Sequence, residues 1–296
     1  PAAFAVAAKT APAPALVTIQ PPASTLSVEA PVRKDSEAAP NETTRKDATP
    51  RDSTPRDTTP VAAAARRADR SLTRALGLKL GRVVLDAGHG GNDVGTHGPS
   101  GYLEKDLTLD VTRRLGALIE ERMGSEVVYT RSDDTYVGLE ERTRIANERE
   151  ADLFLSIHAN SSPYRSAAGV ETYILNFTTS KTALETAARE NATSQRSIHE
   201  LHDLVEKIAL KDKIEESTQF ALKLQSTLSA ISTRSNDAAK NRGVKKAPFV
   251  VLIGAAMPSV LAEIGFLTNS TDEALLRKPE HRQKIAEARS EEHTSE

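Results

Sequence analysis

The sequence predicts an α/β fold, in which helices cover both faces of a sheet. From Gly81 onwards, short apolar runs typical of strands alternate with segments whose apolar residues recur at helical spacing. Alternation of this kind indicates a sheet with helices on both faces. All 15 glycines lie between Gly77 and Gly265, whereas ten of the 15 prolines lie in residues 1–60. We therefore expect one folded domain, over residues 78–288.

The first helices and strands follow from local patterns. Arg82–Asp86 is a short buried strand that ends in a glycine-rich turn. Leu107–Arg122 places its apolar residues on one helical face and stops at Met123-Gly124. Glu126–Thr130 predicts a second strand, and Leu139–Glu150 a second helix.

The rest of the predicted sheet comes from four apolar segments. Asp152–Ile157 is a third strand, and Gly169–Leu175 alternates with period two, as a strand with one wetter face does. Val250–Ile253 and Ser259–Ile264 predict two further strands. Asp272–Ala288 predicts a closing helix.

Residues 181–240 are expected to form a helical insertion. The chain between Leu175 and Phe249 has no glycine before Gly243, and three apolar faces recur there at helical spacing. A usual connection between strands needs only one helix and short loops. An insertion in a loop region is a candidate for regulation.

The two ends of the chain differ from this domain. Residues 1–70 hold only nine large apolar side chains, too few to offset the entropy of ordering that much backbone. Three short repeats there each end in proline, which predicts a disordered, semi-extended linker rich in Ala, Pro and Thr. A docking repeat is the alternative. Residues 289–296 form a polar tail.

Charge and composition exclude several classes of protein. The chain has 39 Lys+Arg against 41 Asp+Glu, so it lacks the basic excess that nucleic-acid binding needs. No run of about 18 apolar residues exists, so we expect no transmembrane segment. An export signal is not visible. The absence of cysteine excludes disulfides and thiolate metal sites.

Four polar side chains are predicted to meet at one edge of the sheet. His89 follows the first strand, His158 follows the third, and Glu263 lies at the carboxyl end of the last. Glu104 lies in the loop after His89, just before a helix. In open α/β sheets, ligands bind in the crevice outside the carboxyl ends of the strands.

This set suits zinc chemistry. A catalytic zinc takes three N or O protein ligands, often two His and one Glu, and leaves a position for water. His89, Glu104 and His158 supply such ligands. Glu263 could take the proton of the water and return it to a leaving amine.

Each residue also has a structural interpretation. A lone histidine near a strand end is more often structural than a ligand, and Glu104 could be an acid favoured by the dipole of its helix. Glu263 is harder to dismiss, because its segment is otherwise apolar and a lone buried carboxylate is costly. Asp86 and Asn160 are placed to orient the ligands. The spacings match no short generic zinc pattern, so the residues alone leave both interpretations open.

Five short motifs occur in order over residues 82–286. They are Val84–Gly91 (VLDAGHGG), Glu104–Asp106 (EKD), Leu139–Arg142 (LEER), Ser156–Asn160 (SIHAN) and Leu261–Phe266 (LAEIGF). In these motifs the chain resembles the zinc-dependent N-acetylmuramoyl-L-alanine amidases of bacterial envelopes. The resemblance implies a mixed sheet of about six strands with helices on both faces. It also implies one zinc ion at His89, Glu104 and His158, with Glu263 as the catalytic carboxylate.

The resemblance further implies a substrate and a place in the cell. The substrate would be peptidoglycan, cut at the amide between the lactyl group of N-acetylmuramic acid and L-alanine of the stem peptide. The location would be the periplasm or cell envelope. The chain looks closest to the branch that splits the septal wall between daughter cells, for cell separation.

In that branch an added helical segment covers the active site until an activator protein displaces it. A glutamate of the segment can occupy the open position of the zinc, and here the resemblance points to Glu190. The alternative is that Glu190 is one of many solvated helix acids. His199 and His202 could be taken for a metal pair, but we expect them on a solvated face because no third ligand is near in sequence.

Two other functions stay open from the sequence. A zinc carboxypeptidase or endopeptidase of the stem peptide would use the same ligands, because zinc and a glutamate hydrolyse any well-positioned amide. A catalytically silent wall-binding module would show no zinc or no turnover.

Overall fold

The computed structural model describes residues 81–194 and 211–288. The chain divides into two units, Pro1–Arg56 and Asp57–Glu296, and all described residues belong to the second. The predicted linker, the polar tail, His199 and His202 lie outside the described residues.

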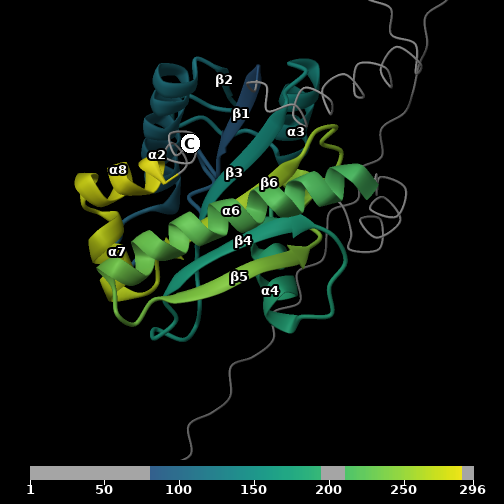
Figure 1. Ribbon diagram of the computed structural model, residues 1–296. Helices are drawn as coiled ribbons and strands as arrows, with labels where there is room; N and C mark the ends of the chain where they lie inside the picture. Colours follow the sequence, from purple (N-terminus) through teal and green to yellow (C-terminus); the bar gives the residue numbers. More distant parts are fainter. Residues whose placement is uncertain (1–80, 195–210, 289–296) are drawn as a thin grey trace, which may run out of the picture. The chain divides into compact units, whose positions relative to one another are not determined.

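A six-stranded mixed sheet forms the centre of the domain (Figure 1). The strands are β1 (Arg82–Ala87), β2 (Glu126–Tyr129), β3 (Leu153–Asn160), β4 (Gly169–Leu175), β5 (Lys240–Ala247) and β6 (Ser259–Phe266). Their spatial order is β2-β1-β3-β6-β4-β5. Only β4 and β6 pair antiparallel, so β1, β3 and β6 lie side by side and end at the same edge. The predicted fold class is confirmed.

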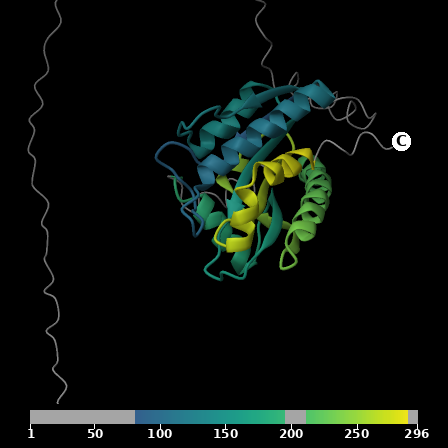
Figure 2. The ribbon, with the colours of Figure 1, turned by 90° about the vertical axis from the view of Figure 1, so that its left-hand side faces the viewer.

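Helices cover both faces of this sheet. One face carries α2 (Glu104–Leu118), α6 (Lys211–Ser235) and α8 (Pro279–Glu287), which Figure 2 shows next to one another. The other carries α3 (Leu139–Glu148), α4 (Lys181–Glu190) and a 3-10 turn, η2 (Val250–Leu252). Within the described residues, no helix is long and apolar enough to cross a membrane.

The strand residues alternate between two separate cores. Val83 and Leu85 of β1 pack with α2, α6 and α8, whereas Val84 between them packs with α3, α4 and η2. Helix α2 ends in a single π-helical turn, η1 (Ile119–Met123), and Gly124 stops it in the left-handed region at φ 54°.

One predicted strand was wrong, and another strand was missed. Val250–Ile253 is a buried apolar run, but its first three residues form the 3-10 turn η2. Short apolar runs do not distinguish a strand from a buried turn. The missed strand is β5, whose sequence is KNRGVKKA. It lacks apolar alternation because it lies at the edge of the sheet, where charged residues are tolerated.

The predicted closing helix is two helices. Helix α7 (Ser270–Leu276) ends before Lys278, and α8 starts at Pro279. Proline at the first helical position has no N–H to lose, and it pushes the residue before it to an extended backbone. Lys278 is accordingly extended, with ψ 122°.

In its described parts, the helical interval at 181–240 contains two helices, α4 and α6, which have different places in the fold. Helix α6 lies across β4 (Figure 1), and Ala221, Leu224 and Leu228 are buried in the core beneath it. It therefore belongs to the layer that covers the sheet. A regulatory role remains a prediction for the segment that begins with α4. The same cover makes every residue of β4 buried, so the wetter face expected for this strand is absent.

Candidate active site

The four side chains predicted to meet do lie at the carboxyl ends of β1, β3 and β6. His89 follows β1, His158 lies within β3 near its end, and Glu263 lies opposite His158 in the register of β6. Helix α2 begins at Glu104 itself. His89, Glu104, His158 and Glu190 each offer one ligand atom, and these atoms all lie within 4.8 Å of one another.

Glycines make room for the ligand side chains. A Cβ on Gly88 would lie 2.5 Å from the imidazole of His158, closer than real Cβ contacts. A Cβ on Gly95 would lie 2.6 Å from both Glu104 Oε2 and His89 Cδ2, and Gly95 also has φ +66°. His89 itself takes φ 60°, a region that costs a non-glycine residue free energy and that persists where surrounding contacts hold it.

Several contacts fix the direction of each ligand. The backbone N–H groups of Thr96 and Ala159 donate to the two oxygens of Glu104, at 2.9 and 3.0 Å. Asp93 Oδ2 lies 3.0 Å from His89 Nδ1, which leaves His89 Nε2 to face Glu104 and Glu190. Carboxylates behind a ligating imidazole orient the ring and raise its basicity.

The carboxylates of this cluster create a negative potential that favours a positive charge among them. Burial alone would lower the pKa of His158, but Glu190 and Glu104 outweigh it and raise that pKa to about 10. Burial would also raise the pKa of Glu104, yet His89 and His158 hold it well below its usual range. A divalent cation would satisfy the same demand.

The donor atoms fit a metal ion. Nε2 of His89 and Oε2 of Glu190 are buried and make no hydrogen bond within the described residues. Their neighbours in the cluster nevertheless lie only 2.9 to 3.2 Å away. Tetrahedral zinc, with bonds of about 2.1 Å, sets its ligand atoms about 3.4 Å apart. Two imidazoles and two carboxylates crowded in this way fit Zn²⁺.

Glu263 is a fully buried carboxyl beside the cluster. Within the described residues, neither of its oxygens has a hydrogen-bond partner. Burial, and then the charge of Glu190, raise its pKa well above the usual value. An uncompensated buried carboxyl is costly to keep, which is typical of a catalytic group.

Glu190 reaches the cluster from the last turn of α4. Its Oε2 lies 2.9 Å from His158 Nδ1 and 3.2 Å from His89 Nε2, and its side chain is 9% exposed. The next residue, Asn191, fastens the helix end to η2, because its amide donates to Pro248 O and accepts from Val250 N–H. In this arrangement α4 covers the ligand atoms.

Asp86 and Asn160, the two residues predicted to orient the ligands, have different contacts from each other. Asp86 pairs with the buried Arg142 at 2.8 Å, and Arg142 donates to the carbonyls of Ala87 and His89. Asp86 therefore supports the backbone of the His89 loop. The amide of Asn160 contacts Glu171 and Arg189, through hydrogen bonds of 3.2 and 3.0 Å.

Sequence reasoning missed three residues that shape the site. Asp93 supports the His89 ring, and the buried Arg131 donates to the carbonyls of Ala87, Gly88 and Lys105. Glu171 is buried in β4 against Asn160. The only signal for Glu171 was a carboxylate in a strand of mostly apolar residues. Asp93 and Arg131 lie in loops, where no periodicity marks them.

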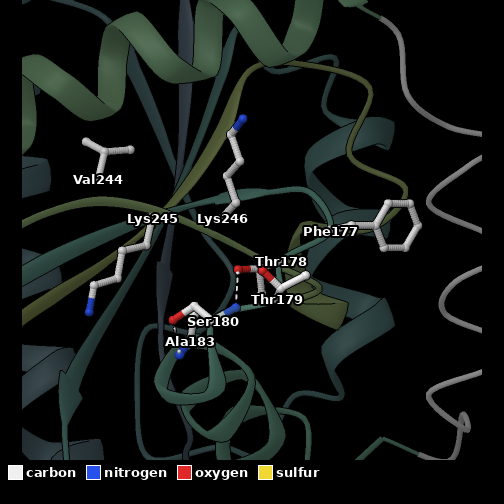
Figure 3. Close-up of a pocket in the computed structure, with 8 residues that line it drawn as sticks. All are labelled: Phe177, Thr178, Thr179, Ser180, Ala183, Val244, Lys245 and Lys246. Atoms are coloured by element: carbon white, nitrogen blue, oxygen red, sulfur yellow. Dashed lines mark hydrogen bonds between the residues drawn. The ribbon is translucent and has the colours of Figure 1, made fainter.

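A pocket of about 550 Å³ lies elsewhere, between the start of α4 and β5 (Figure 3). Phe177, Ser180 and Ala183 line one side, and Lys245 and Lys246 extend from β5 in opposite directions. None of the predicted site residues lines this pocket.

Comparisons with known proteins identify the family. Residues 83–291 match the family model of N-acetylmuramoyl-L-alanine amidase. The chain is 33% identical over 220 residues to N-acetylmuramoyl-L-alanine amidase AmiA of Escherichia coli, covering 71% of this chain and 73% of AmiA. It is 38% identical over 207 residues to YqiI of Bacillus subtilis, covering 70% and 80%.

A solved structure agrees. Amidase AmiC2 of Nostoc punctiforme is 31% identical, with a TM-score of 0.51, and the match covers 71% of this chain and 93% of AmiC2. The region that the family model matches contains all of the clustered side chains and all six strands except Arg82, the first residue of β1. The chain therefore belongs to the N-acetylmuramoyl-L-alanine amidases.

Proposed function

We propose that this peptidoglycan amidase depends on zinc and that α4 keeps its activity low. His89, Glu104 and His158 are the protein ligands of the enzyme that turns over, and Glu263 is its catalytic carboxylate. The single observation that carries the proposal is the convergence of four ligand atoms within 4.8 Å, beside a buried carboxyl that has no hydrogen-bond partner among the described residues.

The chemistry divides between the ion and the chain. Bound zinc supplies a Lewis acid for the amide carbonyl and lowers the pKa of water. Glu263 takes a proton from the attacking water on a carboxylate oxygen and delivers it to the leaving amine nitrogen of L-alanine. Asp93 and the backbone N–H groups of Thr96 and Ala159 keep the ligands in place meanwhile.

Glu190 occupies the position that substrate needs. Its carboxylate lies between the two imidazoles, and α4 buries the ligands, so the stem peptide has no access while the helix is docked. An activator protein that displaces α4 would expose the site. This control suits septal wall splitting during cell separation, in the periplasm or cell envelope, where unregulated cleavage would damage the wall.

The assignment of Glu263 is tested by substitution. Glu263→Gln keeps the shape of the side chain but cannot accept the proton of water, so release of stem peptide from purified wall should fall by about 10²-fold or more. Zinc content, measured by elemental analysis, should stay at one per chain because Glu263 is not a ligand. Mass analysis of the wall fragments separates amidase cleavage from cleavage within the stem. Retained activity in Glu263→Gln would show that another group acts as the base.

A further inference from the structure

The amide of Asn160 is held in one orientation beside the ligand cluster. Its Nδ2 donates to Oε2 of Glu171 at 3.2 Å. A carboxylate can only accept, so this contact decides which end of the amide faces Glu171. The carbonyl oxygen Oδ1 must then face the other way, where it accepts from Arg189 Nη2 at 3.0 Å. Asn160 is 2% exposed.

Glu171 is itself firmly placed. Lys245 Nζ lies 2.9 Å from its Oε1, and the hydroxyl of Tyr173 donates to its Oε2 at 2.5 Å. Glu171 also lies opposite Glu263 in the register of β4 and β6. Glu171, which fixes the orientation of Asn160, therefore belongs to the sheet and not to α4.

The outward oxygen of Asn160 contacts the end of α4 that reaches the ligand cluster. Asn160 is two residues beyond the ligand His158 on β3, and Arg189 immediately precedes Glu190, whose Oε2 is 2.9 Å from His158 Nδ1. When α4 leaves, Oδ1 loses Arg189 as its donor and becomes open to water and to substrate. A backbone N–H group of a peptide in the site can then take the place of the Arg189 donor.

We propose that Asn160 Oδ1 is a substrate-binding acceptor for a backbone N–H of the stem peptide, and that Arg189 blocks this acceptor while α4 is docked. The inference rests on the proposed function and deepens it. Helix α4 then imitates the substrate at two points. Glu190 takes the place of the reacting group among the ligands, and Arg189 takes the place of a peptide N–H on Asn160.

The test uses the full chain with Arg189→Ala and Glu190→Ala together, which frees both positions. In this background Asn160→Ala should raise KM for a soluble muramoyl peptide about 3- to 10-fold, the equivalent of one hydrogen bond. We expect kcat within about twofold and unchanged zinc content. Equilibrium binding of the free stem peptide to the zinc-depleted protein should weaken by the same factor.

Two further variants make the result decisive. Glu171→Gln can donate to Asn160 and so release its orientation, and it should raise KM in the same direction even if Asn160→Ala fails to fold. Asn147→Ala is the matched control, because the side-chain amide of Asn147 also makes two hydrogen bonds, in its case to backbone groups, Gly254 O and Ala256 N–H. It should leave KM unchanged.

An unchanged KM in both Asn160→Ala and Glu171→Gln, or an equal rise in Asn147→Ala, would overturn the inference. Failure of the proposed function looks different. The background variant itself would then release no stem peptide from wall, whatever residue stands at position 160.

Discussion

At the scale of single residues, buried charges hold the loop of the first ligand. Asp86 is fully buried and accepts from Arg142, Thr130 and Ser156, and the last two hydrogen bonds are each 2.6 Å. Burial would raise the pKa of Asp86, but Arg142 and the two hydroxyls outweigh it and lower the pKa. Because Arg142 also binds the carbonyl of His89, the pair links fold stability to the geometry of the site.

We predict that Asp86→Asn costs about 3 to 5 kcal/mol in the free energy of unfolding, since it leaves Arg142 buried without its counter-charge. Urea denaturation measures this. The control is Glu141→Gln, which breaks an exposed pair with Arg144 and should not move the midpoint.

The same pair sets a dependence on pH. The pKa of Asp86 is lower in the folded state than in the unfolded chain. The ionised carboxylate therefore contributes its full share of the folding free energy above the ordinary pKa of 3.8, and this share is lost as the pH falls toward the lowered pKa. The difference in the free energy of unfolding between the wild-type chain and Asp86→Asn should therefore shrink as the pH falls below 3.8. A difference that stays constant through this range would contradict the account.

At the scale of elements, the end of α4 is the part that must move if the proposed control operates. The helix has ten residues, and few of its side chains are buried: Ala183, Thr186 and Ala187. Its attachment at the cluster depends on Glu190, Arg189 and the amide of Asn191. Helix α6, in contrast, is 25 residues long and contributes to the main core. Deleting the interval through Ser235 would remove that cover, so point variants are the sharper tests.

Asn191→Ala should raise the basal rate of wall digestion, because it removes both hydrogen bonds that fasten α4 to η2 and shifts the helix toward the undocked state. A loss of about 1 to 2 kcal/mol corresponds to roughly 5- to 30-fold more undocked protein. Asn147→Ala cuts similar contacts to the same segment from α3 and should not raise the rate. Equal rates in the two variants would assign the effect to the η2 segment.

The sequence predicted most elements and missed those whose pattern is set by distant neighbours. Apolar periodicity was enough for β1, β3, β6 and the helices that cover them. Strand β5 was missed because it is basic at the sheet edge, and η2 was taken for a strand because burial alone makes a run apolar. The four residues His89, Glu104, His158 and Glu263 could be predicted because strand ends of parallel neighbours share one edge. Arg131 could not, since its contacts with Ala87 and Gly88 lie far apart in sequence. Asp93 and Glu171 could not, because nothing in their local pattern shows which side chains they face.

At the scale of the whole molecule, one buried cluster ties the sheet, the His89 loop, α2 and α4 together. Zinc bound there would favour the folded over the unfolded chain, in proportion to the logarithm of its free concentration over Kd. Dialysis against a chelator should therefore abolish stem-peptide release and lower Tm, and added Zn²⁺ should restore both. Full activity after removal of metal to below one-tenth equivalent would exclude a zinc enzyme.

We propose above all that Glu190 keeps the activity of a competent zinc amidase low, and Glu190→Gln tests this most directly. The initial rate of stem-peptide release from purified wall is measured for the wild-type chain and for Glu190→Gln at equal zinc content. Glutamine keeps the length of the side chain but removes the charge that draws it to His89 and His158, so we predict a rate at least about fivefold higher. An unchanged or lower rate, with zinc content and Tm preserved, would contradict the account.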